Sequence, residues 1–231
     1  MAEKIVILTG AGISAESGLG TFRDVGGLWT EYNLEDVATP EGFARNPALV
    51  RRFYDARREN ALGARPNAAH HALARLAAAR PGDVTLITQN IDTLHEAAGH
   101  TGVLHMHGRI DQARCGDCGA VVPWTGPMTA EDQCEACESV GSMRPDVVWF
   151  GEMPIGLDLI ADRLAAATLF VAIGTSGAVY PAAGFVAEAR QYRARTLELS
   201  LEPSDVSGLF DETRLGAATE IVPAWVDTLL A

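Results

Sequence analysis

The segment Val84-Thr85-Leu86-Ile87-Thr88-Gln89-Asn90-Ile91-Asp92 decides the fold. It begins as an apolar run typical of a buried strand and ends in polar side chains that can hydrogen-bond a sugar and an amide. An imidazole, His107, follows after fourteen residues, directly before Gly108. Open α/β sheets bind their ligands at the carboxyl ends of such strands. The segment therefore predicts a ligand site in which Asn90 and Asp92 lie near a candidate base, His107.

The first apolar run, Lys4–Leu8, leads into the turn Gly10-Ala11-Gly12-Ile13-Ser14. A strand that feeds a Gly-x-Gly turn is typical of dinucleotide folds, where small residues let the backbone approach a pyrophosphate. Taken alone, the turn is equally consistent with an ordinary strand-to-helix connection. It also lacks the third glycine and the later acidic residue of the dehydrogenase fingerprint. The glycine-rich loop that follows carries Phe22 and Arg23, which suit either a ligand-covering loop or a flexible surface loop.

Further strand-like segments alternate with helical patterns along the chain. This alternation predicts an α/β fold with a doubly wound, parallel, Rossmann-like sheet. The segments are Arg144–Phe150, Leu169–Ile173 followed by Gly174-Thr175-Ser176, Thr196–Leu201 ending in Ser200-Leu201-Glu202, and a last strand with its helix within residues 220–230.

Two insertions interrupt this pattern and are expected to form a smaller domain. The first, residues 28–65, is helical, and the second, residues 109–145, carries all four cysteines. The predicted Rossmann-like domain then consists of residues 1–27, 66–108 and 146–231.

The four cysteines occur as two Cys-x-x-Cys pairs separated by fifteen residues. This spacing predicts a tetrahedral zinc site, and four thiolate ligands leave no coordination position open for catalysis. Two disulfides or a redox dithiol are the alternatives, and a reducing compartment disfavours the first. We therefore expect one structural zinc ion in a zinc-ribbon module, held by Cys115, Cys118, Cys134 and Cys137.

All six histidines lie between His70 and His107. We expect His70, His71 and His100 to be structural or exposed, and His95 to lie at the start of a helix. His105 and His107 alternate along a strand-like segment, so they should face the same side. In the helical segment Pro47–Leu62, the spacing of Tyr54 and Arg57 places them on one face. A half-buried Tyr beside a snorkelling Arg is the simplest interpretation of that pair.

The bulk composition bounds the class of function. The 231 residues carry a formal net charge of −12. This charge argues against binding to nucleic acid or an anionic membrane, because phosphate neutralisation needs clustered Lys and Arg. The apolar run Ile5–Leu8 is too short for a signal peptide, and no window reaches the roughly 18 apolar residues of a membrane span. The expected compartment is the cytoplasm.

Taken in order, these segments resemble the sirtuin family of NAD-dependent protein lysine deacylases. Within the family, Tyr-x-x-Arg at residues 54–57 resembles the bacterial and mitochondrial class that includes desuccinylases and demalonylases. One departure is Ser200, where the family commonly has Asn, since Ser keeps a hydrogen-bonding group but shortens its reach. The resemblance covers essentially the whole chain and is carried by Gly10–Ser14, Gly18–Arg23, Thr88–Asp92, His107-Gly108, the four cysteines, Asp146–Glu152 and Gly174–Ser176.

The resemblance implies that NAD is a co-substrate and that His107 and Asn90 are catalytic. Arg23 and the backbone amides of residues 10–14 would hold the pyrophosphate, and Asn90 and Asp92 would grip the nicotinamide ribose and carboxamide. The acyl oxygen would attack the ribose as nicotinamide leaves, with His107 as general base toward a ribose hydroxyl and Phe22 as a shield. The products would be lysine and O-acyl-ADP-ribose. The expected NAD contacts are Gly10, Ala11, Gly12, Ser14, Phe22, Arg23, Gln89, Asn90, Ile91, Asp92, Gly174, Thr175, Ser176, Ser200, Leu201, Glu202 and Ala218.

The resemblance also implies how an acyl-lysine protein or peptide would bind. Tyr54 and Arg57 would meet the distal carboxylate of a succinyl or malonyl group, which Arg can hold in a bidentate fork. Removal of these groups should exceed removal of acetyl groups. The alternatives are mainly deacetylation, mono-ADP-ribosyl transfer, NAD binding without turnover, and nucleic-acid binding through the zinc module. The residues expected to take the peptide as an added strand are Val147, Val148, Trp149 and Phe150.

Overall fold

The computed structural model describes residues 3–20 and 32–231, and its largest element is a six-stranded sheet. The strands lie in the order β3-β2-β1-β7-β8-β9, and every neighbouring pair is parallel. Strand β1 lies at the centre. The chain first adds β2 and β3 on one side of β1 and then β7, β8 and β9 on the other side, as in Rossmann-like folds. This order confirms the predicted fold class. The strands are β1 (Ile5–Thr9), β2 (Val84–Thr88), β3 (Leu104–His105), β7 (Leu169–Ile173), β8 (Arg195–Ser200) and β9 (Glu212–Leu215).

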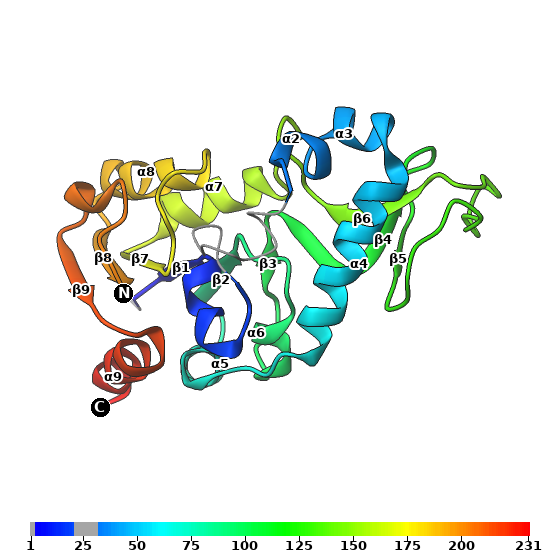
Figure 1. The fold of residues 1–231 in the computed structure, drawn as a ribbon. Coiled ribbons are helices and arrows are strands. Elements are labelled where there is room, and N and C mark those ends of the chain that lie inside the picture. The colour runs from blue at the N-terminus through cyan, green and yellow to red at the C-terminus, as the bar shows by residue number, and fades with distance from the viewer. Residues whose placement is uncertain (1–2, 21–31) are drawn as a thin grey trace.

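Helices cover both faces of this sheet (Figure 1). Side chains alternate along β1, so that Ile5 and Ile7 pack with one helical layer while Val6 and Leu8 pack with the other. Every residue of β1 is buried, which explains its continuous apolar sequence. One layer contains α5 (Ala68–Ala79) and α9 (Ala218–Leu230), and the other contains α7 (Leu157–Ala166) and α8 (Phe185–Gln191).

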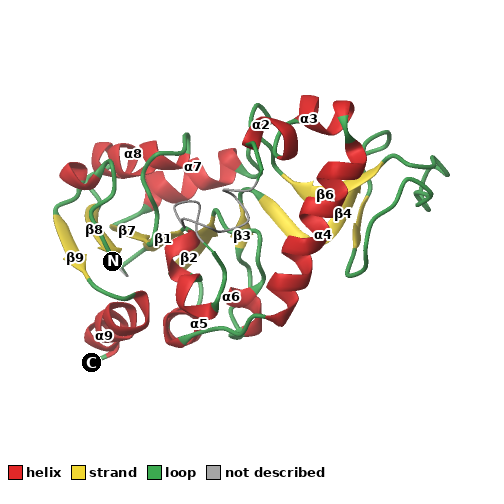
Figure 2. Cartoon of the chain, viewed as in Figure 1, coloured by secondary structure: helices red, strands yellow, loops and turns green. Residues whose placement is uncertain are grey.

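A smaller antiparallel sheet lies beside the large one and packs against the longest helix (Figure 2). Its strand order is β5-β4-β6. The apolar residues between this sheet and the helix include Phe53, Tyr54, Ile110 and Trp149. The elements are β4 (Gly108–Cys115), β5 (Val121–Pro123), β6 (Met143–Val147), α2 (Leu34–Val37), α3 (Pro40–Arg45) and α4 (Pro47–Gly63).

Two expectations about individual elements are wrong. The strand near Arg144 exists as β6, but it pairs with β4 of the small sheet instead of continuing the parallel sheet. It therefore crosses the expected domain boundary at 145/146, and the division into two domains stays a prediction. Residues 220–230 contain no strand, because Val222, Trp225 and Val226 are buried at helical spacing within α9. The last strand is β9, which precedes that helix.

Short elements connect these layers. Asn67 caps α5, since its Oδ1 accepts a hydrogen bond from the backbone N–H of Ala69 at 3.0 Å. Within residues 3–20 and 32–231, no helix is both long and apolar enough to cross a membrane. The remaining elements are α6 (Leu94–Ala97) and the 3-10 helices η1 (Ala11–Ile13), η2 (Ala15–Ser17), η3 (Ala182–Gly184) and η4 (Ser207–Leu209).

Candidate active site

Two glycine turns meet where the neighbouring strands β1 and β7 end. The backbone N–H of Gly12 donates to the carbonyl oxygen of Gly174 at 2.9 Å. A Cβ added to Gly12 would lie 2.8 Å from the Cα of Gly174, so only glycine fits there. Gly174 itself has φ +59, a conformation that favours glycine. The turns mark the point where the strand order reverses, which is where open α/β sheets bind ligands.

A cavity of about 980 Å³ opens at this edge of the sheet and extends to the small sheet and α4. It is lined by every described residue that the sequence analysis assigned to NAD, to substrate or to catalysis. Phe22 and Arg23 lie outside the described residues. The expected residues that line the cavity are Gly10, Ala11, Gly12, Ser14, Tyr54, Arg57, Gln89, Asn90, Ile91, Asp92, His107, Val147, Val148, Trp149, Phe150, Gly174, Thr175, Ser176, Ser200, Leu201, Glu202 and Ala218.

Ser14, Asn90 and Asp92 form a buried polar network at the floor of this cavity. The hydroxyl of Ser14 donates to Oδ2 of Asp92 at 3.1 Å and accepts from Nδ2 of Asn90 at 3.2 Å. The Asn90 amide also donates to the carbonyl oxygen of Gly10 at 3.1 Å. Because both amide hydrogens are used within the chain, the Oδ1 acceptor of Asn90 is left for a ligand.

The Asp92 carboxyl is 7% exposed. Burial raises its pKa, while hydrogen bonds from the backbone N–H of Leu94 and from Ser14, together with the charge of His105, oppose that rise. Oδ1 accepts the Leu94 bond at 3.1 Å and Oδ2 accepts the Ser14 bond. Each oxygen keeps a further lone pair, so an ionised Asp92 can also accept a hydrogen bond from a ligand N–H.

The imidazole of His107 is fixed in one tautomer. Its Nδ1 lies 3.0 Å from the carbonyl oxygen of Gln89. A carbonyl oxygen only accepts, so Nδ1 carries the proton and the neutral ring has its lone pair at Nε2. Burial lowers the pKa of His107, although the hydrogen bond to Gln89 raises it in part. A neutral imidazole with a free Nε2 can accept a proton from a hydroxyl group in the cavity.

Tyr54 and Arg57 share one face of α4, as their spacing predicts, and both line the cavity. The indole Nε1 of Trp149 donates to the Tyr54 hydroxyl at 3.0 Å, which fixes the end of the Tyr54 side chain. The Arg57 guanidinium lies 5.6 Å from the centroid of the Tyr54 ring. Burial lowers the pKa of Arg57, and Tyr54 and Asp92 oppose this effect. The arrangement places a guanidinium and a phenol together in the wall of the cavity.

Several cavity residues, among them Asn60 and Tyr180, have no counterpart in the sequence analysis, whereas Glu152 ends one of the segments that carry the resemblance. Asn60 follows Arg57 by three residues on α4, so helical spacing contained the signal. Glu152 accepts from the backbone N–H of Trp149 at 2.8 Å and pairs with Arg144 at 2.6 Å, which organises the loop after β6. Tyr180 reaches the cavity from a distant loop, and no local pattern in the sequence indicated this.

The four cysteines form a separate cluster at the far end of the small sheet. Their four Sγ atoms all lie within 4.8 Å of one another. The Cys115–Cys137 and Cys118–Cys134 pairs are each separated by 3.7 Å between sulfurs. Zn–S bonds of about 2.3 Å in a tetrahedron place sulfurs roughly 3.8 Å apart. The thiol cluster therefore fits one structural zinc ion, as the sequence predicted.

Known proteins resemble this chain along nearly its whole length. An NAD-dependent protein deacylase of Caulobacter vibrioides is 61% identical over 231 residues, covering 99% of this chain and 97% of the relative. An NAD-dependent protein deacylase of Escherichia coli K12 is 55% identical over 229 residues, covering 98% and 82%. Both relatives are aligned well beyond the segments that carry the sequence resemblance.

Solved structures agree with these sequence matches. A Sir2 homologue in complex with NAD has a TM-score of 0.89 at 37% identity, covering 98% of this chain and 89% of that one. A mutant Sir2 homologue in complex with ADP-ribose has a TM-score of 0.90 at 36% identity, covering 98% and 92%. Residues 10–181 match the Sir2 family directly. The expected resemblance to sirtuins is thus confirmed, and this chain belongs to the Sir2 family.

Proposed function

We propose that this member of the Sir2 family is an NAD-dependent protein lysine deacylase that prefers acidic acyl groups. The observation that carries the proposal is that one cavity is lined by the glycine turns, the Asn90 and Asp92 pair, His107, and the Tyr54 and Arg57 pair. Relatives named NAD-dependent protein deacylases support the reaction class. The acyl preference rests on Tyr54 and Arg57 alone.

The residues at the sheet edge fit a dinucleotide. Gly10, Gly12 and Gly174 leave no room for a Cβ against the opposite turn, and such turns let backbone amides approach a pyrophosphate. Asn90 offers an acceptor oxygen, and Asp92 offers a carboxylate that suits an amide N–H. Bound NAD supplies the electrophilic ribose carbon and nicotinamide as the leaving group. The protein's part is to hold these groups and exclude water.

His107 is the candidate general base. Its Nε2 lone pair can take the proton of a ribose hydroxyl, and the bond from Nδ1 to Gln89 keeps the ring oriented while it does so. A positioned base of this kind contributes about 10² to 10⁴-fold in rate. The lowered pKa of His107 keeps the ring neutral near pH 7, which is the form that accepts a proton.

The segment Val147–Phe150 is the candidate binding edge for a substrate peptide. The backbone N–H of Val148 donates to the carbonyl oxygen of His107 at 2.9 Å, and that of Phe150 donates to Ala38 at 2.9 Å. The N–H of Trp149 donates to Glu152. These amides are therefore already used, so a peptide lying beside this edge would donate its own N–H groups to carbonyl oxygens of the segment. A solved Sir2 mutant in complex with a deacetylated peptide supports a peptide substrate.

The acyl preference follows from the electrostatics of Arg57. A guanidinium can pair with a carboxylate in a bidentate fork, which a neutral acetyl tip cannot offer. Tyr54, whose hydroxyl accepts from Trp149, has its own O–H available as a second donor to a carboxylate. We therefore expect succinyl and malonyl groups to be removed faster than acetyl groups.

A paired assay tests the proposal. One peptide carrying either acetyl-lysine or succinyl-lysine is incubated with NAD, and both the peptide and released nicotinamide are followed by mass spectrometry. Arg57→Met should lose the succinyl preference and retain deacetylation, while Arg52→Met, an exposed arginine on the same helix, serves as the matched control. His107→Tyr should abolish both activities.

Each alternative has its own signature in this assay. Acetyl removal that dominates and is unchanged in Arg57→Met would contradict the acyl preference. NAD label that accumulates on protein would indicate mono-ADP-ribosyl transfer instead. Cytoplasmic location and the absence of nucleic-acid binding stay predictions from the sequence, and a gel shift at low salt tests the second.

A further inference from the structure

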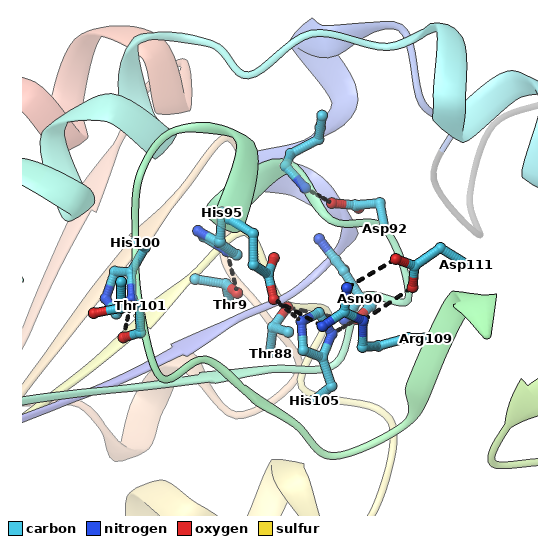
Figure 3. Close-up of polar contacts among 12 residues, drawn as sticks. Thr9, Thr88, Asn90, Asp92, His95, His100, Thr101, His105, Arg109 and Asp111 are labelled. Atoms are coloured by element: carbon cyan, nitrogen blue, oxygen red, sulfur yellow. Dashed lines mark hydrogen bonds and ion pairs between the residues drawn. The ribbon is translucent and has the colours of Figure 1, made fainter. Parts of the chain in front are cut away.

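His105 lies two residues before His107 and contacts the same polar loop. Parallel pairing of β3 with β2 sets His105 opposite Thr88. Its Nδ1 is 3.2 Å from the carbonyl oxygen of Asn90, whereas Nδ1 of His107 bonds to the preceding carbonyl, that of Gln89. The two imidazoles therefore contact consecutive peptide units of the loop that carries Asn90. Figure 3 shows His105 directly beside Asn90, on the side away from Asp92.

The two rings differ in what their second nitrogen meets. His107 lines the cavity, whereas His105 does not, and its side chain is 7% exposed. Nε2 of His105 lies 2.6 Å from Oε1 of Glu96 on α6. Burial raises the pKa of Glu96, but the hydrogen bond and charge of His105, with the charge of Arg109, outweigh burial and lower it overall. Both ring nitrogens of His105 therefore face acceptors, the Asn90 carbonyl oxygen and the Glu96 carboxylate.

Other charged groups surround this pair from each neighbouring element. On β4, Arg109 approaches Oε1 of Glu96 at 3.7 Å and is itself held by Asp111 at 2.8 Å (Figure 3). His95 of α6 and His100 of the following loop lie nearby, and burial lowers the pKa of both, so they are neutral near pH 7. The Asp92 carboxyl, on the loop after β2, interacts electrostatically with both His105 and Glu96.

We propose that His105 and Glu96 act as a positioning pair for the deacylation reaction: Glu96 orients the His105 ring, and the ring fixes the Asn90 peptide of the cofactor loop. This inference rests on the proposed function of the cavity. His105 does not touch the cavity, so it acts through Asn90. The bond to the Asn90 carbonyl fixes the peptide whose side chain presents Oδ1 to the ligand.

Two variants separate the two bonds of the pair. In His105→Gln, the amide group can donate to Asn90 or to Glu96 but not to both. We expect kcat/KM for NAD to fall roughly tenfold, mainly through a higher KM for NAD, while KM for the acyl-lysine peptide stays close to that of wild type. In Glu96→Gln, an acceptor oxygen for Nε2 is kept, so the loss should be smaller. His71→Gln and Glu59→Gln, both exposed, are the matched controls.

Nitrogen-15 NMR of the histidine rings provides a readout that does not depend on activity. Wild type should show an Nδ1–H signal for His105, hydrogen-bonded to the Asn90 carbonyl, that disappears in His105→Gln and persists in Glu96→Gln. A wild-type protein without NAD-dependent deacylation would overturn the proposed function, yet this signal would still report the bond to Asn90. A His105 ring without a proton on Nδ1, or a kcat/KM for NAD in His105→Gln that equals that of His71→Gln, would overturn the positioning proposal.

Discussion

Nδ1 of His107 lies 3.0 Å from the carbonyl oxygen of Gln89, which makes Nε2 the nitrogen that accepts a proton. Burial lowers the pKa of this ring, so the neutral, active form persists below the ordinary histidine value of about 6.5. We expect the acid limb of kcat/KM in wild type to have its midpoint below pH 6.5. Initial rates with a succinyl-lysine peptide between pH 5 and 9 measure it, and a midpoint above pH 7 would contradict the assignment.

Removal of the Tyr54 hydroxyl should lower the stability of the protein. The Trp149 indole N–H that donates to it is buried, and in Tyr54→Phe this donor has no acceptor. An unsatisfied buried donor costs about 1–3 kcal/mol in the free energy of unfolding. Urea denaturation measures this loss, with Tyr192→Phe, 52% exposed, as the control. Equal stability of the two variants would show that the hydrogen bond contributes nothing.

The contact between the glycine turns should not tolerate even one methyl group. In Gly12→Ala the new Cβ would meet backbone atoms of Gly174 at 2.8 and 2.9 Å, and backbone cannot move aside as a side chain can. We expect a loss of about 1–3 kcal/mol in stability, together with weaker NAD binding. Gly63→Ala is the control, because its Cβ would meet nothing within 4 Å and Ala favours the helix. Calorimetry of unfolding and titration with NAD would measure both effects.

Zinc removal should unfold the small module and leave the parallel sheet intact. The residues packed around the cysteines are few, and they include Ala113, Met128 and Met143. Metal binding therefore supplies much of the folding free energy of this module. We expect one zinc per chain by elemental analysis, and a lower thermal midpoint after chelation that is restored by added zinc. A chelated protein that contains no zinc but melts at the same temperature would contradict this role.

The sequence predicted those features that depend on local chemistry. The apolar run of β7, the glycine turns and the cysteine spacing each carry their structural reason within a few residues. Features set by partners far along the chain were not predictable. Every residue of β9 is exposed, so its sequence lacks the alternation of apolar and polar residues that predicts a strand. Only its pairing with β8 makes it a strand. The pairing of β6 with β4, and the approach of Tyr180 to the cavity, depend on packing in the same way.

Acid should destabilise the protein through its buried histidines, and His70 allows a measured test. Its side chain is fully buried, and burial, with a smaller effect of His71, lowers its pKa to about 4. The unfolded chain takes up this proton near pH 6.5 but the folded protein does not, so stability is lost as the pH falls from about 6.5 toward 4. The shift corresponds to about 3 kcal/mol. Between pH 7 and 4, wild type should therefore lose about 3 kcal/mol more than His70→Gln, while His71→Gln, an exposed neighbour, should follow wild type. If urea denaturation shows that the free energy of unfolding falls equally with pH in wild type and His70→Gln, the buried ring is not the source of the acid destabilisation.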